Sequence, residues 1–226
     1  MESRTYLACG LLVLGMLMPV PAWGHDMVQP PWRGDEGTTY QEWRFDTDAN
    51  PALPEVISNS YGSAMASIVL GDYASGWQVQ LPSLGDQIGY WDLGGDRGNG
   101  GGSILIDVDN RPLALECKEV WVQVTYFRDM SQAPTVTVPG AAYVTGQTLL
   151  VEHVLTGGDW YLDQSIWRIE PNPDHEQILI TSDPTWGSVI DQIVIDTICI
   201  PEPATMGLFL VGSWAMIARR RRAARV

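Results

Sequence analysis

Two short acidic stretches have the residue spacing that suits a calcium ion. Asp46, Asp48 and Asn50 alternate in "DTDAN", and "DVDN" at 107–110 has the same spacing of its two carboxylates, with the asparagine directly after them. Ca²⁺ takes six to eight oxygen ligands, and carboxylates at i and i+2 with an amide oxygen close behind supply several of them. Neither stretch has the central glycine and final glutamate of an EF-hand loop. We therefore place any structural Ca²⁺ at Asp46, Asp48 and Asn50, because the second stretch is also what a strand end and turn require.

Aromatic side chains are the second candidate binding feature. Eight tryptophans lie between residues 25 and 200. Exposed indole rings stack on sugars, whereas buried ones fill a core, each removing roughly 150–250 Å² from water. We expect most of them in the core. Trp91 and Trp160 each adjoin a glycine-rich turn, which makes these two the best candidates for exposed, glycan-stacking rings.

Recognisable catalytic motifs are missing from the sequence. It has no Gly-x-Ser-x-Gly elbow, and its His-Glu pair at 175–176 is followed by Leu179 where a zinc protease motif has a second histidine. Carboxylates are abundant, and two of them at a suitable separation would serve a glycosidase, but abundance does not establish such a pair. We expect a protein that is not an enzyme.

The net charge of the domain limits the classes of molecule that it can bind. Residues 25–200 hold 7 of the 13 basic and 25 of the 27 acidic residues, a formal charge of −18. Nucleic acid is excluded, because binding phosphates requires a basic surface. Strong negative charge favours solubility and cations, and it repels acidic polymers.

The amino-terminal segment has the layout of a secretory signal peptide. Arg4 precedes a mostly apolar run, which two prolines interrupt, and Ala22-Trp23-Gly24 puts small residues at both ends of a cleavage tripeptide. We expect residues 1–24 to be removed before His25, leaving an exported domain.

The carboxyl-terminal segment has the layout of a membrane anchor. Residues 204–218 carry no charge, and as a helix they span about 22 Å, short of the ~30 Å hydrocarbon core. Snorkelling arginine stems and local bilayer thinning make up the difference. Positive charge stays on the cytoplasmic side, so the main domain should lie outside. The membrane-stop cluster is Arg219, Arg220, Arg221, Arg222 and Arg225.

Pro201-Glu202-Pro203 directly precedes that apolar run. Pro-Glu-Pro, a short membrane segment and an arginine cluster, in that order, resemble the PEP-CTERM sorting signal of bacterial exported proteins. The resemblance covers residues 201–226. It implies that an exosortase-type transpeptidase cuts near Pro-Glu-Pro and passes the protein to the cell surface or extracellular matrix. Two prolines exclude regular helix at the junction, which leaves an extended peptide for a protease.

Two cysteines remain once the signal peptide is removed. An even number in an oxidising compartment predicts a disulfide between Cys117 and Cys199. Closing a loop of ~80 residues would stabilise the fold by about 4 kcal/mol in the chain-entropy picture. The alternative of two buried thiols stays open, because sequence does not show whether the two Cβ atoms face each other.

The elements that must position these residues are β-strands. About ten short segments of alternating, β-branched character are separated by Gly, Pro, Asn and Asp between residues 64 and 200. The clearest are 103–109, 118–127, 147–155, 161–170, 175–181 and 190–200. This spacing predicts an all-β protein, an antiparallel β-sandwich of jelly-roll type. Residues 25–62 are irregular apart from the strand-like piece "TYQEWRFDTD", and we expect them to wrap the sandwich or to form an edge strand and long loops.

The sequence therefore predicts an exported protein with a structural or adhesive role at the cell surface or in a polymer matrix. A carbohydrate-binding module that uses exposed tryptophans, with or without Ca²⁺, is the main alternative. A glycan-active enzyme on the same scaffold is a third.

Overall fold

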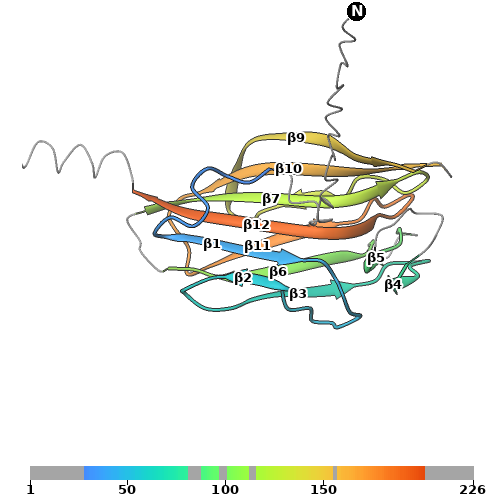
Figure 1. Cartoon of the computed structure of the whole chain (residues 1–226), viewed down its shortest axis with the longest axis horizontal. Helices are drawn as coiled ribbons and strands as arrows, with labels where there is room; N and C mark the ends of the chain where they lie inside the picture. Colours follow the sequence, from blue (N-terminus) through green and yellow to red (C-terminus); the bar gives the residue numbers. More distant parts are fainter. Residues whose placement is uncertain (1–27, 81–87, 97–100, 112–115, 155–156, 202–226) are drawn as a thin grey trace, which may run out of the picture.

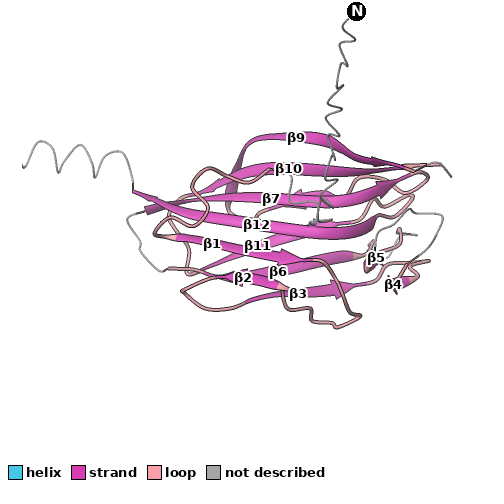
Figure 2. Ribbon diagram, viewed as in Figure 1, coloured by secondary structure: helices cyan, strands magenta, loops and turns pink. Residues whose placement is uncertain are grey.

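The computed structural model describes residues 28–80, 88–96, 101–111, 116–154 and 157–201, and these ranges contain strands and loops but no helix (Figures 1 and 2). Within the same ranges, accordingly, no helix has the length and hydropathy needed to cross a bilayer. The expected signal peptide at 1–24 and membrane segment at 204–218 lie outside the described residues.

Two antiparallel sheets make up the domain. The larger sheet has a six-strand path, to which β5 (Tyr90–Asp92) is added beside β12 and β4 (Gly76–Gln78) beside β5. The smaller sheet has four strands. Along the larger path the order is β2 (Val56–Ser58), β1 (Thr38–Trp43), β12 (Val189–Pro201), β7 (Glu116–Arg128), β10 (Asp159–Ile169) and β9 (Ala141–His153). The smaller sheet runs β3 (Ala64–Val69), β6 (Ser103–Asp109), β11 (His175–Thr181) and β8 (Thr135–Thr137).

Side-chain alternation creates the core between the sheets. In a strand every second side chain points to the same face. Ile104, Ile106 and Val108 of β6 are fully buried, and they share one apolar cluster with Val120 and Val122 of β7. Each such side chain stabilises the fold by about 1.5–3 kcal/mol when it is fully removed from water. The predicted all-β, antiparallel architecture is therefore confirmed, while its finer jelly-roll connectivity is not established by this strand order.

Part of the segment expected to be irregular forms regular structure. β1 lies inside the larger sheet, paired with β12 on one side and β2 on the other. Before it, residues 28–37 cross the outer face of the larger sheet: Trp32 packs edge-on against Trp121, with 5.9 Å between ring centroids. Residues 28–37 thus lie against the larger sheet at Trp32, whereas residues 38–43 form an interior strand.

Arg33 attaches this crossing segment to β12. Its Nε and Nη2 donate to the two carboxylate oxygens of Asp196 at 2.5 and 2.7 Å, and its guanidinium lies 4.0 Å from the Tyr40 ring centroid. The Asp196 side chain is fully buried. A bidentate arginine–carboxylate pair in such a position fixes geometry as well as contributing energy.

We expect Arg33→Ala to lower the free energy of unfolding by about 3 kcal/mol, because a buried carboxylate loses its bidentate partner. Urea denaturation followed by tryptophan fluorescence measures the change. Arg168→Ala is the control: Arg168 forms a solvent-exposed pair with Glu170 at 2.6 Å, and its loss should leave the midpoint unchanged. Equal shifts in both variants would contradict a special role for Arg33.

Candidate functional site

The two tryptophans expected to be exposed are buried, so that expectation is wrong. Trp91 belongs to the core between the sheets, and Trp160 is fully inaccessible in a second cluster with Phe127 and Val154. The Trp160 and Phe127 ring centroids are 5.1 Å apart. A glycine-rich turn beside a tryptophan exposes the turn, but the ring follows the face of its own strand.

A different pair of aromatic residues is exposed at the loop end of the molecule. Trp186 and Tyr73 are 59% and 67% accessible, and both line a pocket of about 360 Å³. We call this the loop pocket. Its lining residues are Tyr73, Asp92, Gly94, Gly95, Asp96, Thr185 and Trp186.

Three loops, 71–76, 93–96 and 183–188, build the loop pocket and are joined through their backbones. The Gly95 amide donates to Asp72 O at 3.1 Å, and the Asp96 amide donates to Pro184 O at 2.7 Å. Gly94 is required at the junction: its φ is +68°, and an added Cβ would lie 2.5 Å from Ala74 N. The pocket is therefore formed by the fold itself.

The backbone that carries each exposed ring has a defined local structure. Asp183 Oδ1 accepts the amides of Thr185 and Trp186, both at 2.8 Å, which fixes the turn that carries Trp186. Tyr73 has φ +62°, a conformation rarely adopted by a bulky residue. Strain of this kind persists where the surroundings impose it, and it gathers at functional sites.

Asp92 lines the loop pocket and joins two of its loops. Its Oδ2 accepts the Ser75 amide at 3.0 Å and the Ser75 hydroxyl, while its Oδ1 accepts the Gly94 amide at 3.0 Å. These bonds connect two of the three loops, so Asp92 serves to position them. Asp96 adds a second carboxylate to the lining, which makes the pocket acidic.

A second hollow lies beside β9 and β10. Its volume is about 410 Å³, and Tyr143 and Trp167 meet in it edge-to-face at 5.3 Å between centroids. Polar neighbours bind one another there: Thr148 donates to Asp163 at 2.6 Å, and Gln147 donates to Gln164 at 2.9 Å. We call it the β9–β10 groove.

Of the three side chains considered for calcium, Asn50 is engaged in other contacts. Asn50 Nδ2 donates to Ile68 O at 2.7 Å, and Asn50 Oδ1 accepts the Ile68 amide at 2.9 Å. The side-chain oxygen is therefore already used in a hydrogen bond. Asp46 and Asp48 are exposed beside it. In the part of the chain that the structure describes, no group of three His, Cys, Asp or Glu side chains could hold a metal ion.

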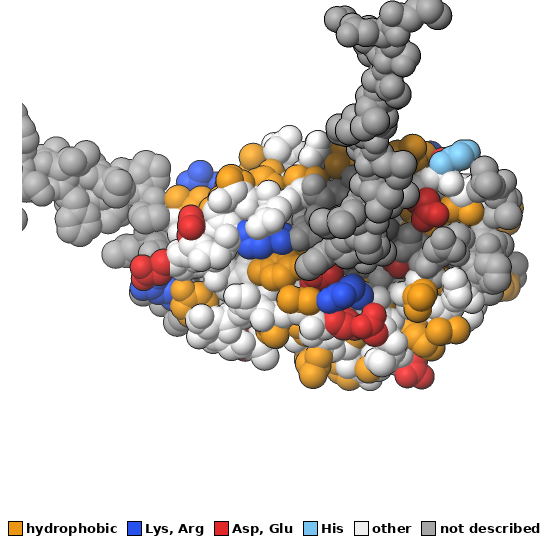
Figure 3. Space-filling model, viewed as in Figure 1, with side chains coloured by type: hydrophobic (Ala, Val, Ile, Leu, Met, Phe, Trp, Pro, Cys, Tyr) orange, Lys and Arg blue, Asp and Glu red, His pale blue; other side chains and the backbone are white. Residues whose placement is uncertain are grey.

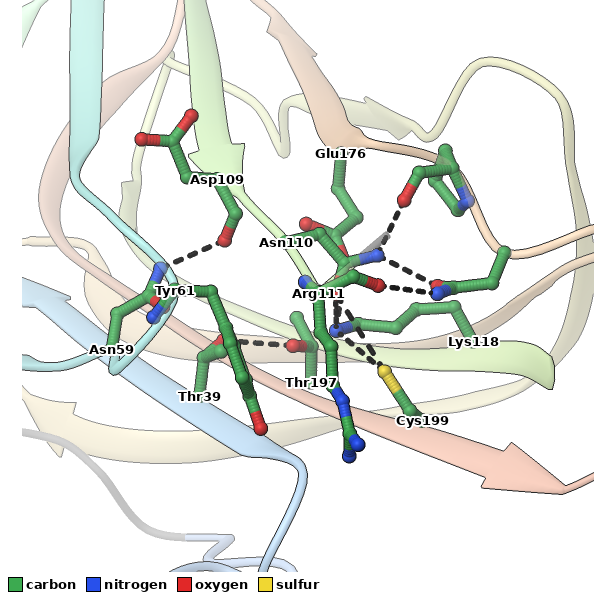
Figure 4. Close-up of polar contacts among 12 residues, drawn as sticks. Thr39, Asn59, Tyr61, Asp109, Asn110, Arg111, Lys118, Glu176, Thr197 and Cys199 are labelled. Atoms are coloured by element: carbon green, nitrogen blue, oxygen red, sulfur yellow. Dashed lines mark hydrogen bonds and ion pairs between the residues drawn. The ribbon is translucent and has the colours of Figure 1, made fainter. Parts of the chain in front are cut away.

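The second acidic stretch is likewise used by the protein. Asp107 accepts Gln177 Nε2 at 2.8 Å, and Asp109 Oδ2 accepts the Ser63 amide at 2.8 Å. Asn110 turns inward and joins a buried polar cluster at one end of the core (Figure 4). The turn function expected of this stretch is therefore only part of what it does.

The buried polar cluster centres on Lys118, which is fully inaccessible. Its Nζ lies 2.5 Å from Asn110 Oδ1, 2.9 Å from Glu176 Oε1 and 3.6 Å from Cys199 Sγ (Figure 4). Asn110 Nδ2 donates at 2.6 Å to both Asn172 Oδ1 and Pro173 O. Burial raises the pKa of Glu176, and the neighbouring Lys118 ammonium lowers it in part.

The predicted disulfide is wrong. Cys117 and Cys199 both lie in described strands, and neither is disulfide-bonded. Cys199 pairs in register with Lys118, and Cys117 pairs with Ile200. Consecutive side chains of a strand point to opposite faces, so the two thiols lie on opposite faces of the larger sheet. Their strands are adjacent, but their Cβ atoms cannot meet.

The sorting tripeptide begins where β12 ends. Pro201 is the last residue of that strand and pairs with Glu116, whereas Glu202, Pro203 and the arginines from Arg219 to Arg222 lie outside the described residues. The basic side chains visible in Figure 3 are separated from one another and form no continuous patch on that face of the described residues.

Comparison with known families identifies a PEP-CTERM protein-sorting motif at residues 200–222. The resemblance of the tail to this signal is thereby confirmed, and the domain before it has no family match. No curated protein matches the chain.

Sequence reasoning missed Tyr73 and Trp186 as a pair. Trp186 lies in "DPTWGS", a turn sequence between two strands where no neighbouring strand is available to cover a ring. This turn sequence could therefore have predicted the exposure of Trp186. Tyr73 lies in "GDYASG", more than a hundred residues earlier, and only the hydrogen bonds among the loops bring the two together.

Both domain cysteines should react with a maleimide only after unfolding. Each is buried, and burial raises the pKa of the Cys117 thiol, which further slows its reaction. The measurement is peptide mapping after labelling in buffer and in guanidinium, without reductant. Failure of either residue to label in guanidinium would restore the disulfide.

Proposed function

We propose that this protein is an adhesive component of the cell surface or extracellular matrix that binds neutral polysaccharide at the loop pocket. The chain carries a PEP-CTERM motif, which indicates an exported protein sorted by exosortase. The observation that carries the binding role is the pair of exposed rings, Tyr73 and Trp186, on a pocket that the fold holds in place.

Pocket chemistry favours a sugar ligand. A pyranose ring has an apolar C–H face that packs on aromatic rings, and its hydroxyl groups hydrogen-bond to carboxylate and backbone oxygens. The loop pocket offers both kinds of partner, with the two rings beside Asp96 and the glycine backbone. A preformed site loses little ordering entropy on binding, which favours affinity.

Charge selects the class of polysaccharide. The chain has a net charge of −14, and Asp92 and Asp96 bring carboxylates into the pocket lining itself. An acidic polymer would be repelled from such a surface, whereas a neutral one would not. The proposed ligand is therefore an uncharged hexose or pentose polymer.

We propose that the loop pocket binds the polysaccharide and does not catalyse a reaction on it. Both carboxylate oxygens of Asp92 hold the loops together, so this residue positions the pocket and does not act on a ligand. The β9–β10 groove, with Tyr143 and Trp167, is a second candidate location for the same ligand class. A structural Ca²⁺ is not needed for either location.

Trp186→Ala and Tyr73→Ala should each weaken binding of a neutral polysaccharide at least tenfold, about 1.4 kcal/mol, because a stacking surface is lost. Titration of the folded protein against neutral and acidic polysaccharides, followed by calorimetry, measures this. Tyr143→Ala tests the β9–β10 groove, which this exposed tyrosine lines, and normal binding by this variant would favour the loop pocket. Loss through Tyr143 alone would move the site to that groove, and no binding to any neutral polymer would end the proposal.

Glu202→Ala should block sorting at the Pro-Glu-Pro tripeptide. The variant should accumulate in the membrane fraction with its arginine cluster intact, whereas the unmodified protein should reach the surface without it. Carboxyl-terminal peptide mapping of both fractions shows the difference. Glu36→Ala, which changes an exposed glutamate of the domain, is the control and should sort normally. Identical processing of all three proteins would contradict recognition of the tripeptide.

A further inference from the structure

The buried polar cluster contains the only lysine of the chain. Lys118 has no exposed surface, and neither does the side chain of Glu176 beside it. Burying an ammonium–carboxylate pair is costly, and an apolar pair of similar size is often at least as stable. A sole lysine at such a position therefore calls for a role beyond stability.

Three groups with complementary chemistry meet there. Lys118 supplies an amine, Asn110 a carboxamide 2.5 Å from that amine, and Glu176 a carboxyl group 2.9 Å from it (Figure 4). We propose that Lys118 and Asn110 become joined by an intramolecular isopeptide bond, with Glu176 moving the proton. The bond would tie β7 of the larger sheet to the end of β6 in the smaller one.

The reaction is an amide exchange that needs no oxidant or cofactor. Glu176 takes a proton from Lys118 Nζ, and the neutral amine attacks Cγ of Asn110 to form the new C–N bond. The protonated Glu176 returns its proton to Nδ2, the Cγ–Nδ2 bond breaks, and ammonia leaves. The remaining Nζ proton departs through Glu176 to the ammonia. The products are a secondary amide and one ammonium ion, so atoms and charge balance.

The surroundings of Asn110 favour each part of this step. The Arg111 amide donates to Asn110 Oδ1 at 2.7 Å, where negative charge develops as the carbonyl is attacked. Asn172 and Pro173 accept from Nδ2 and hold the leaving group, each at 2.6 Å. Groups held this close react with a high effective concentration.

Glu176 is suited to carry the proton. The apolar core beyond the cluster disfavours separated charges, so transfer of the proton from Lys118 to Glu176 costs less there than in water. Next along the same inward rows lie Val108, Val120 and Ile178, all fully buried. The raised pKa of Glu176 has burial as its main cause, which is consistent with the geometry.

The mass of the purified full chain tests the bond. We expect an intact mass lower than the sequence mass by one ammonia. A protease that cuts after Asp and Glu should release residues 110–116 still joined to residues 117–119. An amine-reactive reagent applied in guanidinium should leave Lys118 unmodified. An intact mass equal to the sequence mass, together with a labelled Lys118, would overturn the proposal. Loss of ammonia without the joined peptide would also overturn it, because that result signifies a succinimide at Asn110.

Variants separate the chemistry from mere packing. Lys118→Arg keeps the positive charge without a primary amine, and Glu176→Gln removes the proton carrier, so both should keep the ammonia. Asn59→Ala is the control: this partly buried asparagine donates to Asp109 O near the cluster, and its loss should leave the joined peptide in place. If either cluster variant fails to fold, the mass and peptide map of the unmodified protein still decide the question.

Discussion

Alternation of side chains along β7 and β12 is the constraint on which the rest of this molecule depends. These two strands pair over twelve positions in the middle of the larger sheet. Every second residue points between the sheets, so Val120, Val122 and Val124 build the core. The same alternation sends Lys118 and Cys199 inward while it turns Cys117 to the opposite face.

That constraint gives the two ends of the domain different characters. At one end the inward rows finish in polar side chains, among them Thr39 and Thr197, whose hydroxyls lie 2.7 Å apart. Lys118 and Asn110 lie at this same end, enclosed with Cys199. At the other end three loops meet and leave aromatic rings in solvent. Polar groups are thus buried at one end, and exposed aromatic rings are presented at the other.

Much of the fold could be predicted from sequence, because alternation is a local property. The segment "SILIDVD" was expected to be a strand with its isoleucines on one face, and β6 has that pattern. Strand pairing is not local, and here the predictions failed. Whether two cysteines face each other depends on a register shift of one residue, which no local pattern encodes.

The candidate site residues were likewise predictable where they depend on local sequence and not where they depend on strand pairing. The sorting signal was found because its three parts, Pro-Glu-Pro, the apolar run and the arginine cluster, follow one another directly in the sequence. Trp91 and Trp160 were chosen for their neighbouring glycines, yet their exposure depends on which strands cover them. Lys118 and Glu176 are 58 positions apart by their numbers and on different sheets, so their meeting could be known only from the assembled fold.

The position of β12 has a mechanical consequence for a protein handled by its carboxyl end. This strand is bonded on both sides, to β1 over six residue pairs and to β7 over twelve. A force applied at Pro201 acts along the axis of β12. It therefore loads the hydrogen bonds to β1 and to β7 together, in shear, and does not break them one after another. A domain tethered there would withstand flow better than one held by an edge strand.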